Sequence, residues 1–158
     1  MRPVSRWTIY LTLLFALLCH LFPWEGRGIV LRPVFMFVVV LYWLLRSPHL
    51  CNVGTAWFAG LLVDLATGSL LGQHALSFTL AAFVGVSYQR RLVLFNAWHL
   101  TGYVLLLLMF ERVLLLLLKL FAGNENPGWY FFLPIFTGML LWQFMIFVFG
   151  TITRPKAK

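Results

Sequence analysis

The 158-residue sequence is 62% hydrophobic and only 10% charged, with a mean hydropathy of +0.92. A water-soluble domain carries about 25% charged residues, so this composition excludes a soluble protein and indicates an integral membrane protein. We attribute the formal net charge of +8 to basic residues at the cytoplasmic rim of the membrane-embedded helices. No basic, aromatic-interleaved domain lies outside the apolar segments, so we expect no nucleic-acid partner.

Long apolar runs separate the charged residues, and their lengths match the roughly 20 residues that cross a bilayer as a helix. Runs such as VLLLLMFERVLLLLLKLF are helical in length and composition. In chain order they predict six transmembrane helices, at about 7–23, 30–46, 51–67, 70–88, 92–121 and 128–150. Turn sequences separate them, including PWEGRG, RSPHLCN, TGSLLG and AGNENPG.

No linker is long enough to divide the chain. We therefore predict one integral membrane domain, 1–158, which is an all-α polytopic bundle of six helices. The fourth span is the least certain in type, because GSLLGQHALSFTL could begin as a re-entrant segment before the helix proper.

Basic residues predict the orientation, because Lys and Arg in short loops are retained on the cytoplasmic side. If the N-terminus is inside, the cytoplasmic segments carry cations and no acids: Arg2, Arg6, Arg46, Arg90, Arg91, Arg154, Lys156 and Lys158. The outer segments carry Glu25, Arg27, Arg32 and Glu125. We therefore predict that both termini are inside.

Tryptophans near helix ends commonly anchor a protein at the membrane interface. By position along the chain, this role is expected for Trp7, Trp24, Trp43 and Trp129. Trp57, Trp98 and Trp142 lie deeper in the predicted spans and are expected to pack inside the bundle.

The sequence contains no constellation of residues that would support catalysis. Its histidines, His20, His49, His74 and His99, fall in four separate regions without the spacing of metal ligands. No glycine-rich phosphate loop, serine nucleophile motif or paired carboxylates occur. We therefore expect a protein that is not an enzyme and that uses no cofactor or metal.

The stretch AGLLVDLATG places Asp64 among aliphatic and small residues. A charge near the centre of a membrane helix costs about 2.5 to 3.5 kcal/mol, which makes Asp64 a functional candidate by default. Ala56, Gly60 and Gly68 share its face at four-residue steps. Because small residues let another helix approach closely, we expect Asp64 to point into a helix–helix contact in the outer half of the membrane.

Glu111, Arg112 and Lys119 interrupt the leucine-rich fifth span. Arg112 lies about 30 Å along that span, near the outer boundary, where its long side chain can reach inward or extend outward. An ion pair between Asp64 and Arg112 is compatible with this placement but not required by it. A helix end that emerges into the outer interface would also account for all three charges.

Residues 31–72, LRPVFMFVVVLYWLLRSPHLCNVGTAWFAGLLVDLATGSLLG, carry an ordered series of motif residues. They are Arg32, Pro33, Tyr42, Trp43, Pro48, His49, Asn52, Val53, Gly54, Gly60, Asp64, Gly68, Leu71 and Gly72. In order and spacing this series resembles the family of the rod shape-determining protein MreD of Gram-negative bacteria. It covers about a quarter of the chain, and the remainder resembles the family in length, span count and basic ends.

The resemblance implies a non-enzymatic, multi-pass component of the elongation machinery in the bacterial inner membrane. Members of this family pair with the bitopic protein MreC. They are linked to the actin-like MreB filament and to RodA and its transpeptidase, which build lateral peptidoglycan. By resemblance, the residues with a packing or partner-contact role would be Arg32, Pro33, Pro48, Asn52, Gly54, Gly60, Asp64, Gly68 and Gly72.

A compact, basic, six-span protein of this size also resembles the substrate-capturing subunit of an energy-coupling-factor vitamin transporter. In that interpretation Arg32, Asp64, Gln73 and His74 would line a small-molecule pocket in the outer half of the membrane. The loop between the first two spans lacks the richer set of polar and aromatic residues that such a pocket would need. We therefore favour the MreD-like interpretation.

Overall fold

The computed structural model describes residues 6–22, 34–92, 97–125 and 127–149. These residues fold into six α-helices and one short 3-10 helix, and they contain no strand. The elements are α1 (Arg6–Leu21), α3 (Phe35–Arg46), α4 (Val53–Thr67), α5 (Gln73–Leu92), α6 (Ala97–Phe121), η1 (Trp129–Phe132) and α7 (Leu133–Phe149). Each α-helix overlaps one of the six predicted apolar segments, and the all-α prediction is confirmed.

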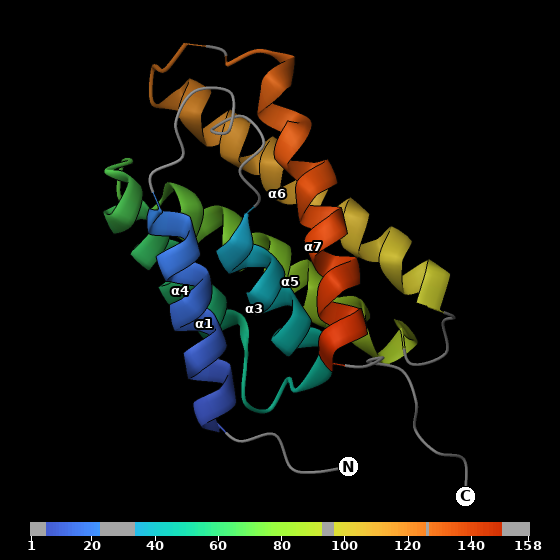
Figure 1. The fold of residues 1–158 in the computed structure, drawn as a ribbon. Helices are drawn as coiled ribbons and strands as arrows, with labels where there is room; N and C mark the ends of the chain where they lie inside the picture. Colours follow the sequence, from blue (N-terminus) through green and yellow to red (C-terminus); the bar gives the residue numbers. More distant parts are fainter. Residues whose placement is uncertain (1–5, 23–33, 93–96, 126, 150–158) are drawn as a thin grey trace, which may run out of the picture.

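Successive helices run in alternate directions along the bundle (Figure 1). The start of α1 and the end of α7 lie at the same end of the molecule, at the bottom of Figure 1, which we call the terminal end. The turn between α6 and η1 lies at the opposite, distal end. At the terminal end Nη1 of Arg46 donates a hydrogen bond to the carbonyl of Phe149 (3.0 Å), which ties α3 to α7.

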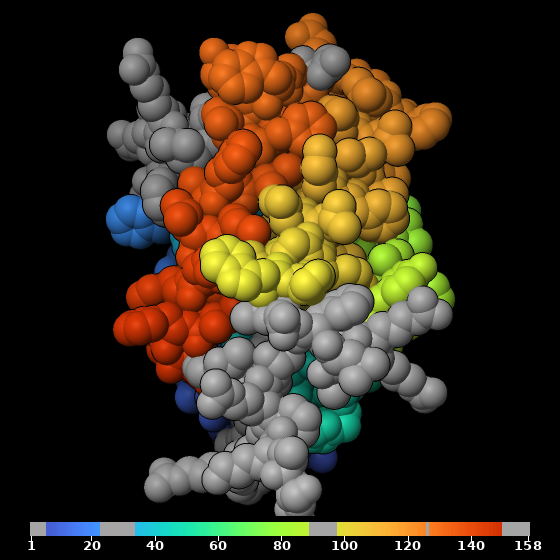
Figure 2. All heavy atoms as spheres, turned by 90° about the vertical axis from the view of Figure 1, so that its right-hand side faces the viewer, coloured from blue at the N-terminus to red at the C-terminus, as the bar shows by residue number. Residues whose placement is uncertain are grey.

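The centre of the bundle is α3, whose residues from Met36 to Leu45 are all buried. It packs against α1, α4, α5 and α7. A helix that is covered on every side is apolar all round, which explains why FMFVVVLYWLLR has a single charged residue, at its end. On another side of the molecule α6 and α7 form one continuous surface (Figure 2).

One segment of the described chain, Trp129–Phe149, is both long and apolar enough to cross a membrane as a single helix. The helices α1, α3 and α4 are apolar but shorter. At 1.5 Å per residue, the 12 residues of α3 rise only about 18 Å, less than a 30 Å hydrocarbon core. The six-span layout and the position of both termini inside therefore stay predictions.

Three of the tryptophans differ from the roles expected from their positions along the chain, whereas Trp142 is buried as expected. Trp43, predicted at the interface, is buried, and its Nε1 donates to Oγ1 of Thr12 in α1 (2.8 Å). Trp98, predicted to pack inside, is 84% exposed, and Trp57 is also exposed. These three predictions are wrong, because the depth of a residue along a helix does not determine which helix face carries it.

Candidate functional site

Asp64 lies in the last turn of α4 and is fully buried. Its Oδ1 accepts hydrogen bonds from the Ser69 hydroxyl (2.8 Å) and from the backbone N–H of His74 (3.0 Å). The ring Nδ1 of His74 lies 2.8 Å from the same oxygen. Oδ2 accepts from the backbone N–H groups of Gly72 (2.9 Å) and Ala75 (3.2 Å). All these donors belong to the turn after α4 or to the first turn of α5, and we call this group the α4–α5 cap.

Helix geometry explains why the start of α5 needs a carboxylate. The first N–H groups of an α-helix have no acceptor within the helix, and they form the positive end of its dipole. A carboxylate supplies several lone pairs, and its negative charge is stabilised there. Because an ionised carboxylate can only accept, the 2.8 Å contact assigns a proton to Nδ1 of His74 when Asp64 is ionised. Asp64 therefore caps α5 from the neighbouring helix and locks the two helices together.

Two glycines shape the turn that brings α5 back onto α4. Gly68 ends α4 with φ 64°, and Gly72 precedes α5 with φ 101°. Both values lie in the left-handed region, which glycine adopts at little cost because it has no Cβ. The chain therefore reverses over residues 68–72 and delivers its N–H groups to Asp64.

Gly60, one helical turn before Asp64, sets the distance between the two helices. A Cβ added there would lie 2.6 Å from Cα of Ala75 and 2.6 Å from the carbonyl oxygen of His74. The pairing of α4 with α5 is the most extensive helix contact in the described residues. The helix that approaches the small-residue face of α4 is therefore α5, from the same chain.

The charges of α6 form a second group, in which Glu111 is buried and Arg112 and Lys119 are partly buried. Glu111 is fully buried, and neither of its carboxylate oxygens has a hydrogen-bond partner among the described residues. Nε of Arg112 lies 3.5 Å from Oε2 of Glu111, and both His74 and Lys119 interact electrostatically with the same carboxylate. The guanidinium of Arg112 and the ammonium of Lys119 each lie 5.2 Å from the ring centre of Phe131 in η1.

This arrangement differs from both sequence interpretations of the α6 charges. Arg112 lies beside Glu111, and the ion pair with Asp64 that the sequence allowed is not formed, because His74 occupies that place. The expectation that Glu111 emerges at a helix end is wrong, because Glu111 is enclosed and α6 continues to Phe121.

Other motif residues lie at the start of α4. The side chain of Asn52 accepts from the backbone N–H of Thr55 (3.1 Å), and the Thr55 hydroxyl accepts from the backbone N–H of Asn52 (3.4 Å). This reciprocal capping box starts the helix. A Cβ on Gly54 would lie 3.2 Å from Oδ1 of Asn52, and Pro48 is exposed in the preceding loop. Two further motif residues, Arg32 and Pro33, lie outside the described residues.

His74 and Ser69 are side chains of the cap to which the MreD-like interpretation gave no role. His74 stood as one of four scattered histidines, ten residues after Asp64. A signal was present, because the glycines at 68 and 72 predict a reversal that would return the following residues to the end of α4.

The side chains around Asp64 and Glu111 hold helices of the bundle together. Both carboxylate oxygens of Asp64 accept hydrogen bonds from the same chain, and Glu111 is buried away from solvent. Within the described ranges, no group of three His, Cys, Asp or Glu side chains could hold a metal ion. The chemistry that this arrangement performs is the stabilisation of a helix start inside an apolar bundle.

Known proteins identify the family of this chain. The family model described as rod shape-determining protein MreD matches residues 1–152. The rod shape-determining protein MreD of Haemophilus influenzae is 28% identical over 154 residues, which are 97% of this chain and 95% of that protein. No solved structure matches the chain. Because the family model matches almost the whole sequence, including α4, α5 and α6, the chain belongs to the family of the rod shape-determining protein MreD, whose members are bacterial membrane proteins.

Proposed function

We propose that this protein is a non-enzymatic membrane scaffold of the cell elongation machinery. In this proposal it maintains rod shape by binding MreC, in one assembly with MreB, RodA and the elongation transpeptidase, and so supports lateral peptidoglycan synthesis. Membership of the MreD family supports the cellular role. The structural observation that supports a scaffold is that the carboxylate of Asp64 accepts its hydrogen bonds from groups of its own chain.

The apolar outer surface of the bundle supports a role in which the protein acts by contacting other proteins within the membrane. Large apolar side chains are exposed on every described helix except the central α3, among them Phe15, Phe58, Phe83, Leu106 and Phe147. The loops at 47–52 and 68–72 are short, so they add little mass outside the bundle. A partner would therefore be recognised largely through its own membrane helices, as a bitopic protein such as MreC would be.

A small-molecule-capturing role receives no support from the same region. In that alternative, Asp64, Gln73 and His74 would contact a ligand together with Arg32, which lies outside the described residues. Asp64 and Gln73 are buried, and Asp64 and His74 are bonded to each other. A ligand would first have to break the α4–α5 cap, which would uncap a helix within the membrane.

Depletion in a rod-shaped host tests the proposed function. We expect depleted cells to become round, and a tagged copy of the chain to restore rods and to co-purify with MreC. A tagged copy that carries Gly102→Ala is the control for the restoration experiment and should also restore rods, because nothing lies within 4 Å of a Cβ added at that exposed position. Rods that persist after depletion, together with tight binding of a vitamin-sized ligand, would reverse the proposal.

A further inference from the structure

One amide side chain lies on the outer surface of the apolar helix α7. This helix contains no charged residue, yet Gln143 is exposed on it. The hydroxyl of Thr137 in the same helix donates to the carbonyl of Pro134 (3.1 Å), so its hydrogen-bonding capacity is already used. Gln143 is therefore the polar group that the surface of α7 presents to its surroundings.

The depth of Gln143 places it inside the hydrocarbon core. The apolar segment Trp129–Phe149 has 21 residues. At about 1.5 Å per residue it is about as long as the core is thick. Gln143 lies about 9 Å along the helix from Phe149, which ends the segment. The short side chain of a glutamine does not extend over that distance to reach water or headgroups.

The described part of the chain uses this amide only partly. The hydroxyl of Thr101 in α6 donates to Oε1 of Gln143 over 3.5 Å, which is a long hydrogen bond. No described group accepts a hydrogen bond from the NH₂ group of Gln143. Lipid chains offer no hydrogen-bond partner, so an amide that faces them is unfavourable. A polar group of another chain would remove that cost.

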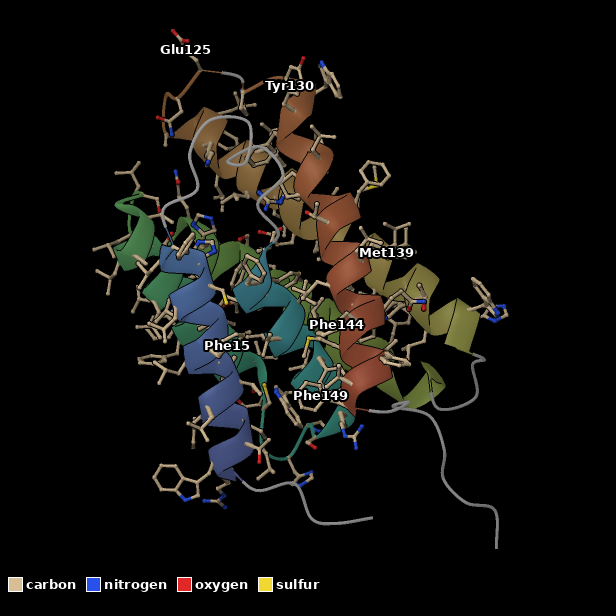
Figure 3. All side chains as sticks on the ribbon, in the orientation of Figure 1. Phe15, Glu125, Tyr130, Met139, Phe144 and Phe149 are labelled. Carbon is tan, nitrogen blue, oxygen red and sulfur yellow. The ribbon has the colours of Figure 1, made fainter. Side chains whose placement is uncertain are left out.

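The residues around Gln143 form an apolar stripe along α7. Phe136, Leu140 and Phe147 lie at three- and four-residue steps from one another or from Gln143, so they share its side of the helix, and all three are exposed. We call these four residues the Gln143 face. It belongs to the surface that α6 and α7 form together (Figure 2). Phe144, by contrast, lines a groove between α1 and α7 (Figure 3).

A second copy of the chain matches Gln143 in both chemistry and depth. A primary amide is donor and acceptor at once, so two amides can bond to each other in both directions. In two copies inserted with the same orientation, both Gln143 side chains lie at the same depth. A twofold axis along the membrane normal brings the same surface of each copy face to face. A helix of another protein would need a polar group of its own at this depth.

We propose that the Gln143 face is the contact between two copies of this chain in the membrane. The α7 helices of the two copies pack side by side, and the NH₂ group of each Gln143 donates to Oε1 of the other. Phe136, Leu140 and Phe147 pack around this amide pair. The dimer goes beyond the proposed function, because it needs no MreC, and it leaves the α4–α5 cap unchanged.

Disulfide cross-linking in membranes tests which surface forms the contact. In a chain with Cys19→Ser and Cys51→Ser, cysteine replaces either Phe147, on the Gln143 face, or Val148, which is exposed at nearly the same depth but lines the groove between α1 and α7. Under oxidation with copper phenanthroline, Phe147→Cys should give a covalent dimer and Val148→Cys should stay monomeric. Equal cross-linking at the two positions, or none at either, would overturn the proposal.

Energy transfer between donor- and acceptor-labelled full chains in liposomes, diluted with lipid, tests the amide itself. Gln143→Leu should weaken dimerisation roughly five- to tenfold, because two hydrogen bonds between membrane helices are lost. Gln143→Asn should dimerise more tightly than Gln143→Leu, because it keeps an amide. Phe144→Leu, outside the Gln143 face, is the matched control and should dimerise like the wild-type chain. A monomeric wild-type chain, or equal dissociation of wild type and Gln143→Leu, would overturn the proposal.

A helix of MreC is the competing occupant of the Gln143 face. If it lies there, MreC will suppress the cross-link of Phe147→Cys and the Gln143→Leu chain will fail to capture MreC, which overturns the dimer. If a second copy lies there, Gln143→Leu loses the dimer and still co-purifies with MreC. Failure of the dimer is therefore distinguishable from failure of the proposed function.

Discussion

Asp64 is buried in a bundle of apolar helices, yet each of its two carboxylate oxygens has more than one donor. Three of these donors are backbone N–H groups at the start of α5, which are fixed in place once the helix forms. Leaving a buried N–H group without an acceptor costs about 1–3 kcal/mol. The carboxylate therefore contributes to stability mainly by preventing that cost.

The stability lost when Asp64 is substituted should increase as fewer hydrogen-bond acceptors remain at this position. Asp64→Asn keeps one acceptor oxygen but turns an NH₂ group toward backbone donors, so we expect a loss of about 1–3 kcal/mol in the free energy of unfolding. Asp64→Leu leaves every donor unpaired and should lose more. Thermal unfolding in detergent, followed by circular dichroism, measures both. Two variants that melt like the wild-type chain would show that the cap is not stabilising.

Glu111 has the opposite surroundings. It is as buried as Asp64, but its nearest cation approaches only to 3.5 Å, and its oxygens receive no hydrogen bond from the described residues. A buried charge without good hydrogen bonds is poor evidence for stability. Replacing the carboxylate by an amide should therefore change the free energy of unfolding by different amounts at Asp64 and at Glu111.

Glu111→Gln should leave stability within about 1 kcal/mol of the wild-type value, because no hydrogen bond is lost and the acceptor facing Arg112 is kept. The same melting experiment measures it, with Asp64→Asn as the paired control. We expect the variant to restore rod shape in depleted cells. A variant that folds normally but leaves the cells round would show that the charge of Glu111 has a functional role beyond packing.

At the scale of elements, α4 and α5 form a helical hairpin with three matched parts. Gly60 permits the close approach, the left-handed glycines at 68 and 72 make the reversal, and Asp64 caps the returning helix. The α4 helix also begins with its own capping box at Asn52. Both ends of α4 are therefore specified by local interactions, and α5 begins only where α4 supplies its cap.

The close contact predicts a large difference between two Gly→Ala substitutions. Gly60→Ala places a Cβ against the backbone of α5, and overpacking of this kind costs about 1–3 kcal/mol. Gly102→Ala, in the interior of α6, meets nothing within 4 Å and should gain up to about 1 kcal/mol from helix propensity. Melting temperatures of the two variants test the contrast. Equal melting temperatures would contradict the close α4–α5 packing.

At the scale of the whole molecule, the described charges differ between the two ends. Arg6 and Arg46 lie at the terminal end, whereas the distal end carries both Lys119, in the last turn of α6, and Glu125, in the turn that follows α6 (Figure 3). Lys and Arg are retained on the cytoplasmic side of a membrane. The terminal end should therefore face the cytoplasm.

Cysteine labelling tests this orientation. In a chain with Cys19→Ser and Cys51→Ser, the exposed residues Glu125 and His49 are replaced one at a time by cysteine. A membrane-impermeant maleimide should label the cysteine at 125 in intact spheroplasts and the cysteine at 49 only after permeabilisation, because these positions lie at opposite ends of the bundle. Labelling in the reverse order would place the terminal end outside.

Much of the architecture follows from the sequence, because apolar length and turn residues are local properties. The apolar runs predicted six helical segments, and all six overlap helices in the structure. The stripe of Ala56, Gly60, Asp64 and Gly68 predicted that another helix would approach that face of α4. The family resemblance was likewise contained in residues 31–72, and the family match over residues 1–152 confirms it.

The partners of the buried charges were decided by the tertiary structure. From sequence, Asp64 had Arg112 as a candidate partner, and His74 was placed near Asp64 only in the transporter interpretation. The rotation of each helix about its axis and the close crossing at Gly60 place His74, and not Arg112, beside Asp64. Sequence spacing specifies the face of one helix, but the direction in which that face points depends on contacts with all its neighbours. For this reason the sequence determined the helices and the approach to α4, whereas only packing determined what Asp64 and Glu111 contact.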